Sequence, residues 1–512
     1  MPETLVVLDF GSQYVQLIIR RVRELGVYCE VLPHTVSAQE LSRLAPAGLI
    51  FSGGPASVIE PEHPACDPSI LQLGLPILGI CYGMQLITSL LGGKVERGRS
   101  GEYGPASIAL TAPTPLFQNI SFPLQVWMSH GDQVRVLPPA FQVLAKTPTC
   151  PVAAMGDEAS RIYGVQFHPE VLHTPKGVEI LSNFLFSIAG CRGEWSMNRF
   201  IDTQVAEIRA RVGQARIICA LSGGVDSAVV AALIHRAVGT QMKAIFVDNG
   251  LLREYEVDQI RAIFTRDYPI DLRIVEAADV FLEGLKGVVD PERKRKIIGD
   301  TFIRVFREEA TRIQGAEFLA QGTLYPDVIE SSSAHGGPSA TIKSHHNVGG
   351  LPEEIGFQLI EPLRYLFKDE VRVLGRTLGL PESLIQRQPF PGPGLAVRIL
   401  GEVTPENLAL LRQADLVVQE EMVRYEGYDD IWQSFAILLP VNSVGVMGDE
   451  RTYARVVALR VVTSRDAMTA DWVKLPYELL GRISSRIINE VKGVNRVVYD
   501  ISSKPPSTIE WE

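Results

Sequence analysis

Residues 216–227 are RIICALSGGVDS, and this stretch decides the fold of the middle of the chain. Its first six residues are mostly apolar and predict a buried strand, and residues 226–237 predict the helix that follows. Residues 243–248 predict the next strand, and residues 256–267 the next helix. Strand, helix and strand at this spacing predict a βαβ unit with parallel strands. The glycine-rich turn therefore joins the end of a parallel strand to the N-terminus of a helix.

The chain on either side predicts two further blocks. Before residue 190, apolar strands at residues 5–10, 48–51 and 76–80 alternate with helical patterns, which predicts a second sheet covered on both faces. Near the C-terminus, long apolar strands and a helix at residues 476–491 predict a small unit whose sheet needs a partner subunit. The expected fold class is α/β, with two doubly wound, mostly parallel-sheet domains and then a small α+β dimerisation domain. The expected domains are residues 1–192, 193–387 and 388–512.

Composition and charge narrow the class of protein. The 512 residues carry a net charge of −10, which argues against a nucleic-acid partner because such binding needs a basic surface. No stretch approaches the ~20 consecutive apolar residues of a membrane helix. The N-terminus also lacks the basic start of a signal peptide. We therefore expect a cytoplasmic protein with no membrane partner.

Two local features leave more than one interpretation. The basic run at residues 293–296 is either a solvated helix face or a grip on a substrate phosphate or on a neighbouring subunit. The six cysteines show no C-x-x-C spacing, which argues against zinc and dithiol-redox sites. A disulfide framework is not expected in a chain of this size with so few cysteines. Most of the six are expected to be small buried residues.

Cys81 lies in the string GICYG at residues 79–83, between an apolar strand and a helix. A helix N-terminus lowers the pKa of a thiol, and the two glycines leave room for a tight turn. This string alone also fits a core cysteine beside two glycines. However, His168 and Glu170 are two residues apart in an extended segment, so the carboxylate can orient the imidazole. Together the three residues predict a nucleophile, its base and the group that orients the base.

The string SGGP at residues 52–55 ends another strand. It is either an ordinary turn or part of an oxyanion hole, in which the backbone amides of Gly54 and Tyr82 donate to the intermediate. With GICYG and FHPE, this string resembles the class I glutamine amidotransferases from residue 3 to about residue 190. The resemblance implies hydrolysis of glutamine through a thioester, with release of ammonia. It also implies glutamine contacts at Gln85, Ser129 and His130.

The string SGGVDS at residues 222–227 is suited to phosphate. Its glycines let the backbone approach a phosphate chain, and its amides, hydroxyls and following helix N-terminus all favour an anion. Walker and dinucleotide-binding strings are absent from the sequence. The alternative is a serine-capped helix after a tight turn.

SGGVDS resembles the pyrophosphate loop of the N-type ATP pyrophosphatases, which cleave ATP between the α and β phosphates. The resemblance implies ATP and Mg²⁺, with Asp226 close to the metal. Asp248 ends the next parallel strand, where such sheets bind ligands, so we expect it to line the adenosine pocket. The residues expected to bind ATP are Ser222, Gly223, Gly224, Val225, Asp226, Ser227 and Asp248.

The two halves in one chain, with strings at residues 298–302, 343–350 and 504–512, resemble the glutamine-hydrolysing GMP synthases over essentially the whole length. That resemblance implies adenylation of XMP by ATP, displacement of AMP by ammonia, and a homodimer. XMP contacts are expected at Lys343, Arg398, Lys504 and Glu510. Lys343 lies in the stretch 331–350, which we expect to close over XMP as a lid. Alternatively, the C-terminal tail, residues 504–512, packs at a dimer interface.

Three other functions fit less well. Glutamine-dependent NAD and asparagine synthetases join a different type of glutaminase to the same loop, so the His-Pro-Glu string counts against them. Transfer of sulfur to tRNA is disfavoured by the acidic charge and by the lack of paired cysteines. A binding module derived from an inactive glutaminase would have lost its nucleophile or its base, and both are present.

Overall fold

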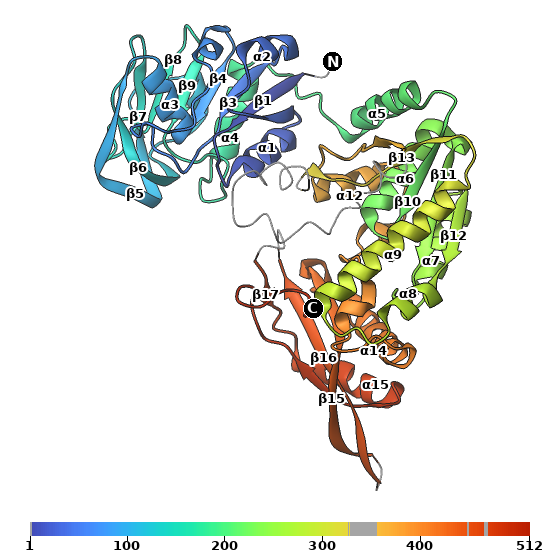
Figure 1. Ribbon diagram of the computed structural model, residues 1–512. Helices are drawn as coiled ribbons and strands as arrows, with labels where there is room; N and C mark the ends of the chain where they lie inside the picture. Colours follow the sequence, from blue (N-terminus) through green and yellow to red (C-terminus); the bar gives the residue numbers. More distant parts are fainter. Residues whose placement is uncertain (1–2, 326, 328–355, 448–449, 465–468) are drawn as a thin grey trace. The chain divides into compact units, whose positions relative to one another are not determined.

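The computed structural model describes residues 3–325, 327, 356–447, 450–464 and 469–512. The chain forms two compact units, Met1–Arg199 and Phe200–Glu512, and each is described here by itself (Figure 1). The expected lid at residues 331–350, with Lys343, lies outside the described residues.

The N-terminal unit is built on a nine-stranded sheet in the order β2-β1-β3-β4-β9-β8-β7-β5-β6. The strands from β2 to β9 are parallel, as predicted, and those from β9 to β6 are antiparallel. The antiparallel extension was not predicted. The parallel strands are β1 (Thr4–Asp9), β2 (Tyr28–Pro33), β3 (Gly48–Phe51), β4 (Ile77–Ile80) and β9 (Ile162–Val165). The others are β5 (Lys94–Leu110), β6 (Leu124–Val136), β7 (Gln142–Lys146) and β8 (Ala154–Asp157).

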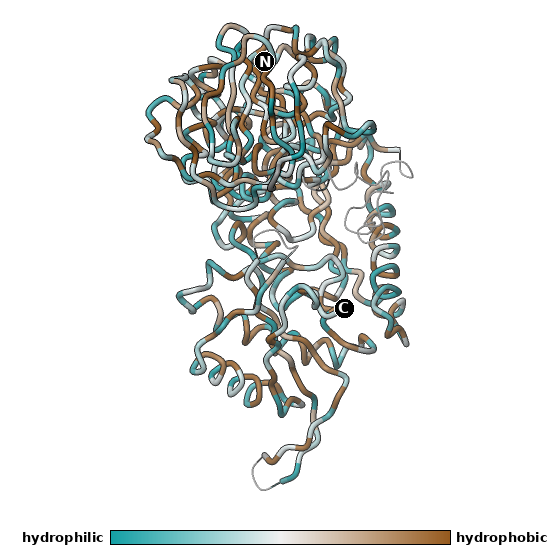
Figure 2. Tube along the Cα trace, turned by 90° about the vertical axis from the view of Figure 1, so that its left-hand side faces the viewer, coloured by the Kyte–Doolittle hydropathy of each residue, from teal (hydrophilic) through white to brown (hydrophobic). Residues whose placement is uncertain are grey.

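The residues of β3 and β4 are fully buried, as expected for parallel strands covered on both faces. Four helices accompany the sheet: α1 (Val15–Glu24), α2 (Ala38–Leu44), α3 (Tyr82–Leu90) and α4 (Gly177–Ser182). Helix α4 begins at Gly177 and passes into a π-helical turn at Asn183–Ile188. In Figure 2 the apolar residues of this unit gather along its inner segments and the hydrophilic ones on its outer turns.

The C-terminal unit contains a five-stranded, wholly parallel sheet in the order β12-β11-β10-β13-β14. The chain starts at the central strand, fills one side and then the other, so the direction of winding changes between β10 and β13. Ligands of doubly wound sheets bind at this switch point. The strands are β10 (Arg216–Leu221), β11 (Met242–Asp248), β12 (Leu272–Glu276), β13 (Ala316–Ala320) and β14 (Gln358–Ile360). The helices are α5 (Met197–Val212), α6 (Val225–Val238), α7 (Glu256–Ala262), α8 (Ala278–Leu285), α9 (Pro291–Thr311), α12 (Lys368–Thr377) and α13 (Glu382–Ile385).

The last part of the chain forms the predicted α+β arrangement. The hairpin of β15 (Gln433–Met447) and β16 (Glu450–Thr463) is joined by β17 (Asp471–Trp472), and by β18 (Val494–Tyr499) parallel to β16. Helices α14 (Pro405–Val423) and α15 (Tyr477–Glu490) contact each other, and α14 also contacts β15. One hydrophobic core includes Ile218 and Phe281 as well as Leu438 and Ile483, so it crosses the predicted boundary at residue 388.

None of the helices that the structure describes has the length and apolar character needed to cross a membrane.

Candidate active sites

Cys81 occupies a strained turn between β4 and α3. Its φ of 51° and ψ of −103° are rare for a residue with a side chain. The turn is held because the Cys81 amide donates to the Val165 carbonyl at 2.7 Å. A Cβ on Gly83 would lie 2.4 Å from the carbonyl oxygen of Phe51, so only glycine fits there. The thiol is therefore fixed at the N-terminus of α3, the positive end of the helix dipole.

His168 and Glu170 lie beyond the end of β9, which stops at Val165. Nδ1 of His168 is 2.8 Å from Oε1 of Glu170, and both side chains are buried. Burial acts to lower the pKa of His168, but the charge of Glu170 and the hydrogen bond with Cys81 outweigh it and raise that pKa to about 10. An imidazolium beside the sulfur stabilises the thiolate, which is the nucleophilic form. The structure thus brings Cys81, His168 and Glu170 together.

The turn at residues 52–54 lies against this group. A Cβ on Gly53 would be 3.2 Å from Cε1 of His168, and a Cβ on Gly54 would be 2.7 Å from the Phe10 carbonyl oxygen. The Ser52 carbonyl accepts from the Gly83 amide at 3.1 Å, which ties the turn to the first residues of α3. Gly53 therefore lies beside the imidazole and Gly54 beside Tyr82, and the role of the Gly54 and Tyr82 amides as an oxyanion hole stays a prediction.

Two of the expected glutamine contacts lie near the thiol. The sulfur of Cys81 is 3.7 Å from the carbonyl oxygen of Ser129. Nε2 of Gln85 donates to the Asp132 carbonyl at 3.0 Å and to Oε1 of Gln166 at 3.3 Å. Gln166 in turn donates from Nε2 to the sulfur of Cys81 at 3.6 Å. Gln166 was not predicted, although it is two residues before His168 and so shares a side of the extended segment.

His130, the third expected glutamine contact, points its ring elsewhere. Its Nδ1 lies 3.0 Å from the Asp132 carbonyl, and its Nε2 lies 3.4 Å from Oε2 of Glu102. Burial lowers the pKa of His130, and the charge of Glu102 only partly opposes this effect.

The other cysteines are free and buried, as predicted. Burial raises the pKa of Cys66 to about 11 and that of Cys150, Cys191 and Cys219 to about 12. These four thiols therefore stay protonated at neutral pH.

The glycine-rich turn after β10 is cross-linked by its two serines. The hydroxyls of Ser222 and Ser227 are 3.1 Å apart, and that of Ser227 also donates to the Gly224 carbonyl at 3.0 Å. Gly223 has a φ of +80°, which favours glycine. The turn leads directly into α6, at the sheet's switch point, so its amides and the helix N-terminus are placed to receive an anion.

Charged side chains that were not predicted surround this turn. Oδ2 of Asp226 pairs with Nζ of Lys368 at 2.5 Å, while its Oδ1 is buried and has no hydrogen-bond partner among the described residues. Nη1 of Arg387 donates to the Gly223 carbonyl at 2.8 Å, and Nη2 of the same guanidinium pairs with Glu256. Lys368 and Arg387 lie more than a hundred residues beyond the turn, and no local motif marks them. Asp248 accepts from the Gly250 amide at 3.0 Å at the end of β11.

Three family models match the chain. Residues 6–188 match "Glutamine amidotransferase class-I", residues 215–307 match "tRNA methyl transferase HUP domain", and residues 420–511 match "GMP synthase C terminal domain". The first match contains the Cys81 site and the second contains the 222–227 turn.

Curated relatives match over the full length. A "GMP synthase [glutamine-hydrolyzing]" of Caldanaerobacter subterraneus subsp. tengcongensis is 58% identical over 100% of this chain and 99% of its own. Those of Heliobacterium modesticaldum and Thermomicrobium roseum are 59% and 57% identical over all of this chain and over 99% and 97% of their own. The chain belongs to the glutamine-hydrolysing GMP synthases. A solved glutamine amidotransferase from Thermotoga maritima covers 37% of this chain and 99% of its own at 17% identity, with a TM-score of 0.30.

Arg398 and Glu510, which were both expected to bind XMP, pair with each other. Nε and Nη2 of Arg398 lie 3.0 and 2.8 Å from the two carboxylate oxygens of Glu510. Arg398 is fully buried, and its guanidinium stacks 3.9 Å from the centre of the Phe435 ring. In this conformation Arg398 holds the tail in place, and contact of either residue with XMP stays a prediction.

The basic run at residues 293–296 also serves the tail. Lys294 is fully buried in α9, and its Nζ donates to the Ile399 carbonyl at 2.7 Å, to the Ala396 carbonyl at 3.3 Å and to the carboxylate of Glu512. Arg295 donates to the backbone oxygen of Glu512. Neither interpretation offered from the sequence describes Lys294, because its ammonium group binds carbonyls and a carboxylate of this same chain.

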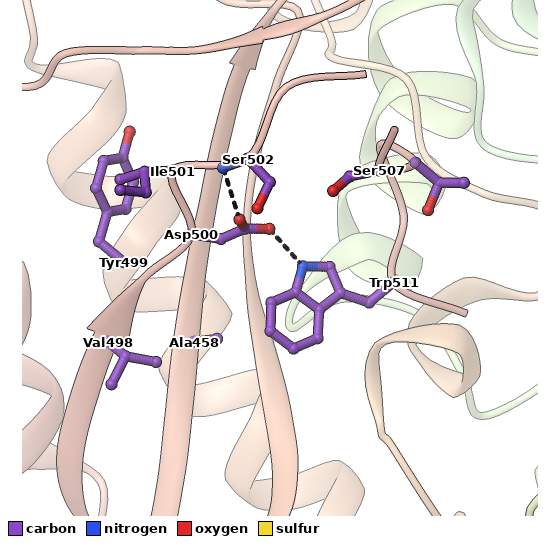
Figure 3. Close-up of a pocket in the computed structure, with 9 residues that line it drawn as sticks. Ala458, Val498, Tyr499, Asp500, Ile501, Ser502, Ser507 and Trp511 are labelled. Atoms are coloured by element: carbon purple, nitrogen blue, oxygen red, sulfur yellow. Dashed lines mark hydrogen bonds between the residues drawn. The ribbon is translucent and has the colours of Figure 1, made fainter. Parts of the chain in front are cut away.

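A pocket of about 500 Å³ lies between β18 and the tail (Figure 3). At its centre Asp500 accepts from the Ser502 amide at 2.9 Å and from the indole nitrogen of Trp511 at 2.8 Å. The hydroxyl residues Ser507 and Thr508 line it as well. Lys504 lies in the same tail, paired through its backbone with Ala470.

Proposed function

We propose that this protein aminates XMP to GMP with nitrogen from glutamine, and that ATP drives the reaction by cleavage to AMP and pyrophosphate. One observation carries the proposal: the chain joins the Cys81 site and the 222–227 turn and is 58% identical over its whole length to a glutamine-hydrolysing GMP synthase. The close approach of Cys81, His168 and Glu170 argues against an inactive glutaminase.

The proposed glutaminase reaction uses three side chains and two amides. The thiolate of Cys81 attacks the side-chain carbonyl of glutamine, and the amides of Gly54 and Tyr82 donate to the oxyanion. The imidazolium of His168 gives its proton to the leaving ammonia, and the same group then takes a proton from the water that hydrolyses the thioester. Glu170 keeps the imidazole oriented throughout.

The proposed synthetase reaction takes place at the switch point. The amides and hydroxyls of residues 222–227 bind the β and γ phosphates while the C2 oxygen of XMP attacks the α phosphorus. Pyrophosphate leaves, ammonia then attacks C2 of the adenylylated ring, and AMP leaves. Free ammonia is largely protonated in neutral water and is then no nucleophile, so it must pass between the two reactions with little exposure.

Mg²⁺ is part of the proposal. Oδ1 of Asp226 is buried and has no hydrogen-bond partner in the described part of the chain, which fits a Mg²⁺ ligand, because this ion binds through one or two carboxylates together with substrate phosphates. The ion would neutralise charge on the phosphates. Lys368 would remain on the other oxygen of the same carboxylate.

For XMP we propose the tail, with Lys504 and Glu510 as contacts and with the hydroxyl-lined pocket of Figure 3 beside them. Arg398 would act through Glu510, and Lys343 completes the proposed set. We further propose a cytoplasmic homodimer and a division of the C-terminal unit into an ATP domain up to residue 387 and a dimerisation domain after it.

Replacement of Cys81 tests the two-site assignment. Cys81→Ala should abolish glutamine-driven GMP formation, because no thioester can form, and should leave the ammonium-driven reaction within about two-fold of the unchanged enzyme. Both are measured as XMP-dependent release of pyrophosphate. Cys66→Ala, another buried cysteine, is the control and should retain both reactions. Loss of both reactions in Cys81→Ala, with the fold intact by circular dichroism, would contradict the proposal.

A further inference from the structure

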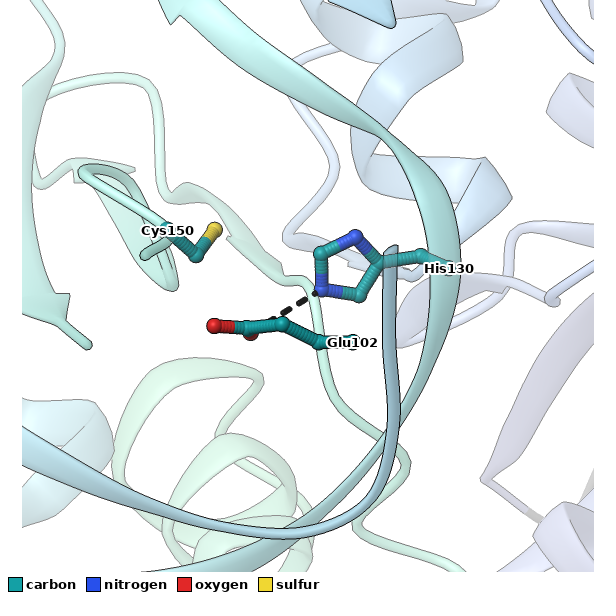
Figure 4. Close-up of side chains that lie close together, drawn as sticks. All are labelled: Glu102, His130 and Cys150. Atoms are coloured by element: carbon teal, nitrogen blue, oxygen red, sulfur yellow. Dashed lines mark ion pairs between the residues drawn. The ribbon is translucent and has the colours of Figure 1, made fainter. Parts of the chain in front are cut away.

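Glu102, His130 and Cys150 come together in the antiparallel part of the N-terminal sheet (Figure 4). Glu102 on β5 and His130 on β6 are direct cross-strand partners, and Cys150 lies in the loop after β7. One donor atom from each side chain lies within 4.8 Å of the others. The spacing of the cysteines predicted no zinc site, because these three residues meet only in the fold.

A neutral imidazole has one ring proton, and the contacts of His130 decide which of its nitrogens carries it. Nδ1 faces the Asp132 carbonyl at 3.0 Å, and a carbonyl can only accept, so Nδ1 carries the hydrogen. Nε2 therefore presents its lone pair to Oε2 of Glu102, 3.4 Å away. Both atoms are buried, and neither has a hydrogen-bond partner among the described residues. Two acceptors that face each other in a buried site call for a cation or a shared proton between them.

The surroundings of Glu102 favour the cation. Oε1 accepts from the hydroxyl of Thr147 at 2.6 Å and from that of Thr149, so these donors orient the carboxylate and leave Oε2 directed at the imidazole. Cys150 is held nearby, since its amide donates to the Thr147 hydroxyl at 2.7 Å. The site thus offers one nitrogen, one oxygen and one sulfur.

We propose that Nε2 of His130, Oε2 of Glu102 and Sγ of Cys150 form a binding site for a divalent cation of the zinc class. Imidazole and thiolate select such ions over Mg²⁺ and Ca²⁺, and three protein ligands leave a fourth tetrahedral position for water. The Cys150 thiol loses its proton to solvent when the ion binds. The ion joins β5 and β6 one residue from Ser129, whose carbonyl is beside the sulfur of Cys81.

Cobalt(II) is the probe, because its bond to a thiolate gives a charge-transfer band. The full-length chain carries Cys81→Ser, so that the Cys81–His168 pair cannot bind the ion through sulfur. Bound metal is first removed from this protein with a chelator. We expect one equivalent of cobalt, the thiolate band, and its loss when zinc is added. Adding Cys150→Ser should remove the band and weaken binding at least ~10-fold, whereas adding Cys66→Ser should change neither.

A second variant keeps the test valid if Cys150→Ser unfolds the unit. Glu102→Gln should retain the band and bind about 10-fold more weakly, with circular dichroism as the check on folding. The absence of saturable binding would mean that Glu102 and His130 share only a proton, and it would overturn the proposal. So would a band that survives Cys150→Ser, or one that is seen only when Cys81 is present. None of these results bears on XMP amination, which the Cys81→Ala assay tests separately.

Discussion

Opposing effects act on the pKa of the His168 imidazole. Full burial alone would favour its neutral form, yet the carboxylate of Glu170 at 2.8 Å and the thiol of Cys81 raise its pKa to about 10. The carboxylate therefore does more than orient the ring, because it also keeps a proton available for the leaving ammonia.

Glu170→Gln tests this role through the pH profile of glutamine hydrolysis. The charge of Glu170 is the largest effect that raises the pKa of His168, so its removal lowers that pKa and the imidazolium is lost at a lower pH. We expect the alkaline limb of kcat/KM to move to lower pH and the maximum to fall on the order of 10²-fold. Glu179→Gln, on the surface of α4, is the matched control. An alkaline limb that does not move would contradict this account.

At the scale of elements, the sequence predicted those whose pattern is local. β10, α6 and β11 form as expected because buried apolar strands alternate with a helix. The GICYG turn forms because a residue with a side chain at position 83 would collide with the backbone of Phe51. The long outer ends of β15 and β16 were missed because they are exposed, and exposed strand ends have no apolar run.

Contacts between distant segments explain the rest of what was missed. Lys368 beside Asp226, and Lys294 beside Glu512, belong to no motif and meet only after folding. Arg398 was expected to contact XMP, and that contact stays a prediction. Its pairing with Glu510, 112 residues later, was not foreseen, because no local pattern links the two residues.

Lys294→Met tests how α9 holds the tail. The substitution leaves two carbonyls and the carboxylate of Glu512 without their buried donor, which should cost about 3 kcal/mol in the free energy of unfolding. If the tail binds XMP, KM for XMP should also rise while glutamine hydrolysis is unaffected. Lys296→Met is the matched control, because Lys296 is exposed two residues away in the same helix, and it should stay within about 0.5 kcal/mol. Urea unfolding and initial rates measure both variants, and equal effects would refute the role of Lys294.

At the scale of the whole molecule, the hairpin of β15 and β16 leaves apolar side chains uncovered by the described residues of its own chain. Val444, Val446 and Tyr453 are 49, 74 and 72% exposed, and Val444 pairs across the hairpin with Tyr453. An exposed apolar patch on an extended hairpin is typical of an interface between subunits.

This surface predicts how the proposed homodimer can be separated. The double change Val446→Asp with Tyr453→Asp should give monomers in light scattering, because two carboxylates would be buried at the interface without partners. Tyr477→Asp is the control, since Tyr477 is 87% exposed and belongs to α15, not to the hairpin. A double variant that remains a dimer would move the interface elsewhere.

The contrast among the thiols offers a way to measure the fraction of active molecules. Burial keeps four of the thiols protonated, whereas Cys81 lies beside the His168 imidazolium at the start of a helix. A mild electrophile added to the native protein should therefore mark one position first, and the amount incorporated would report the fraction of molecules with a competent glutaminase half. That number can be obtained before any nucleotide is added.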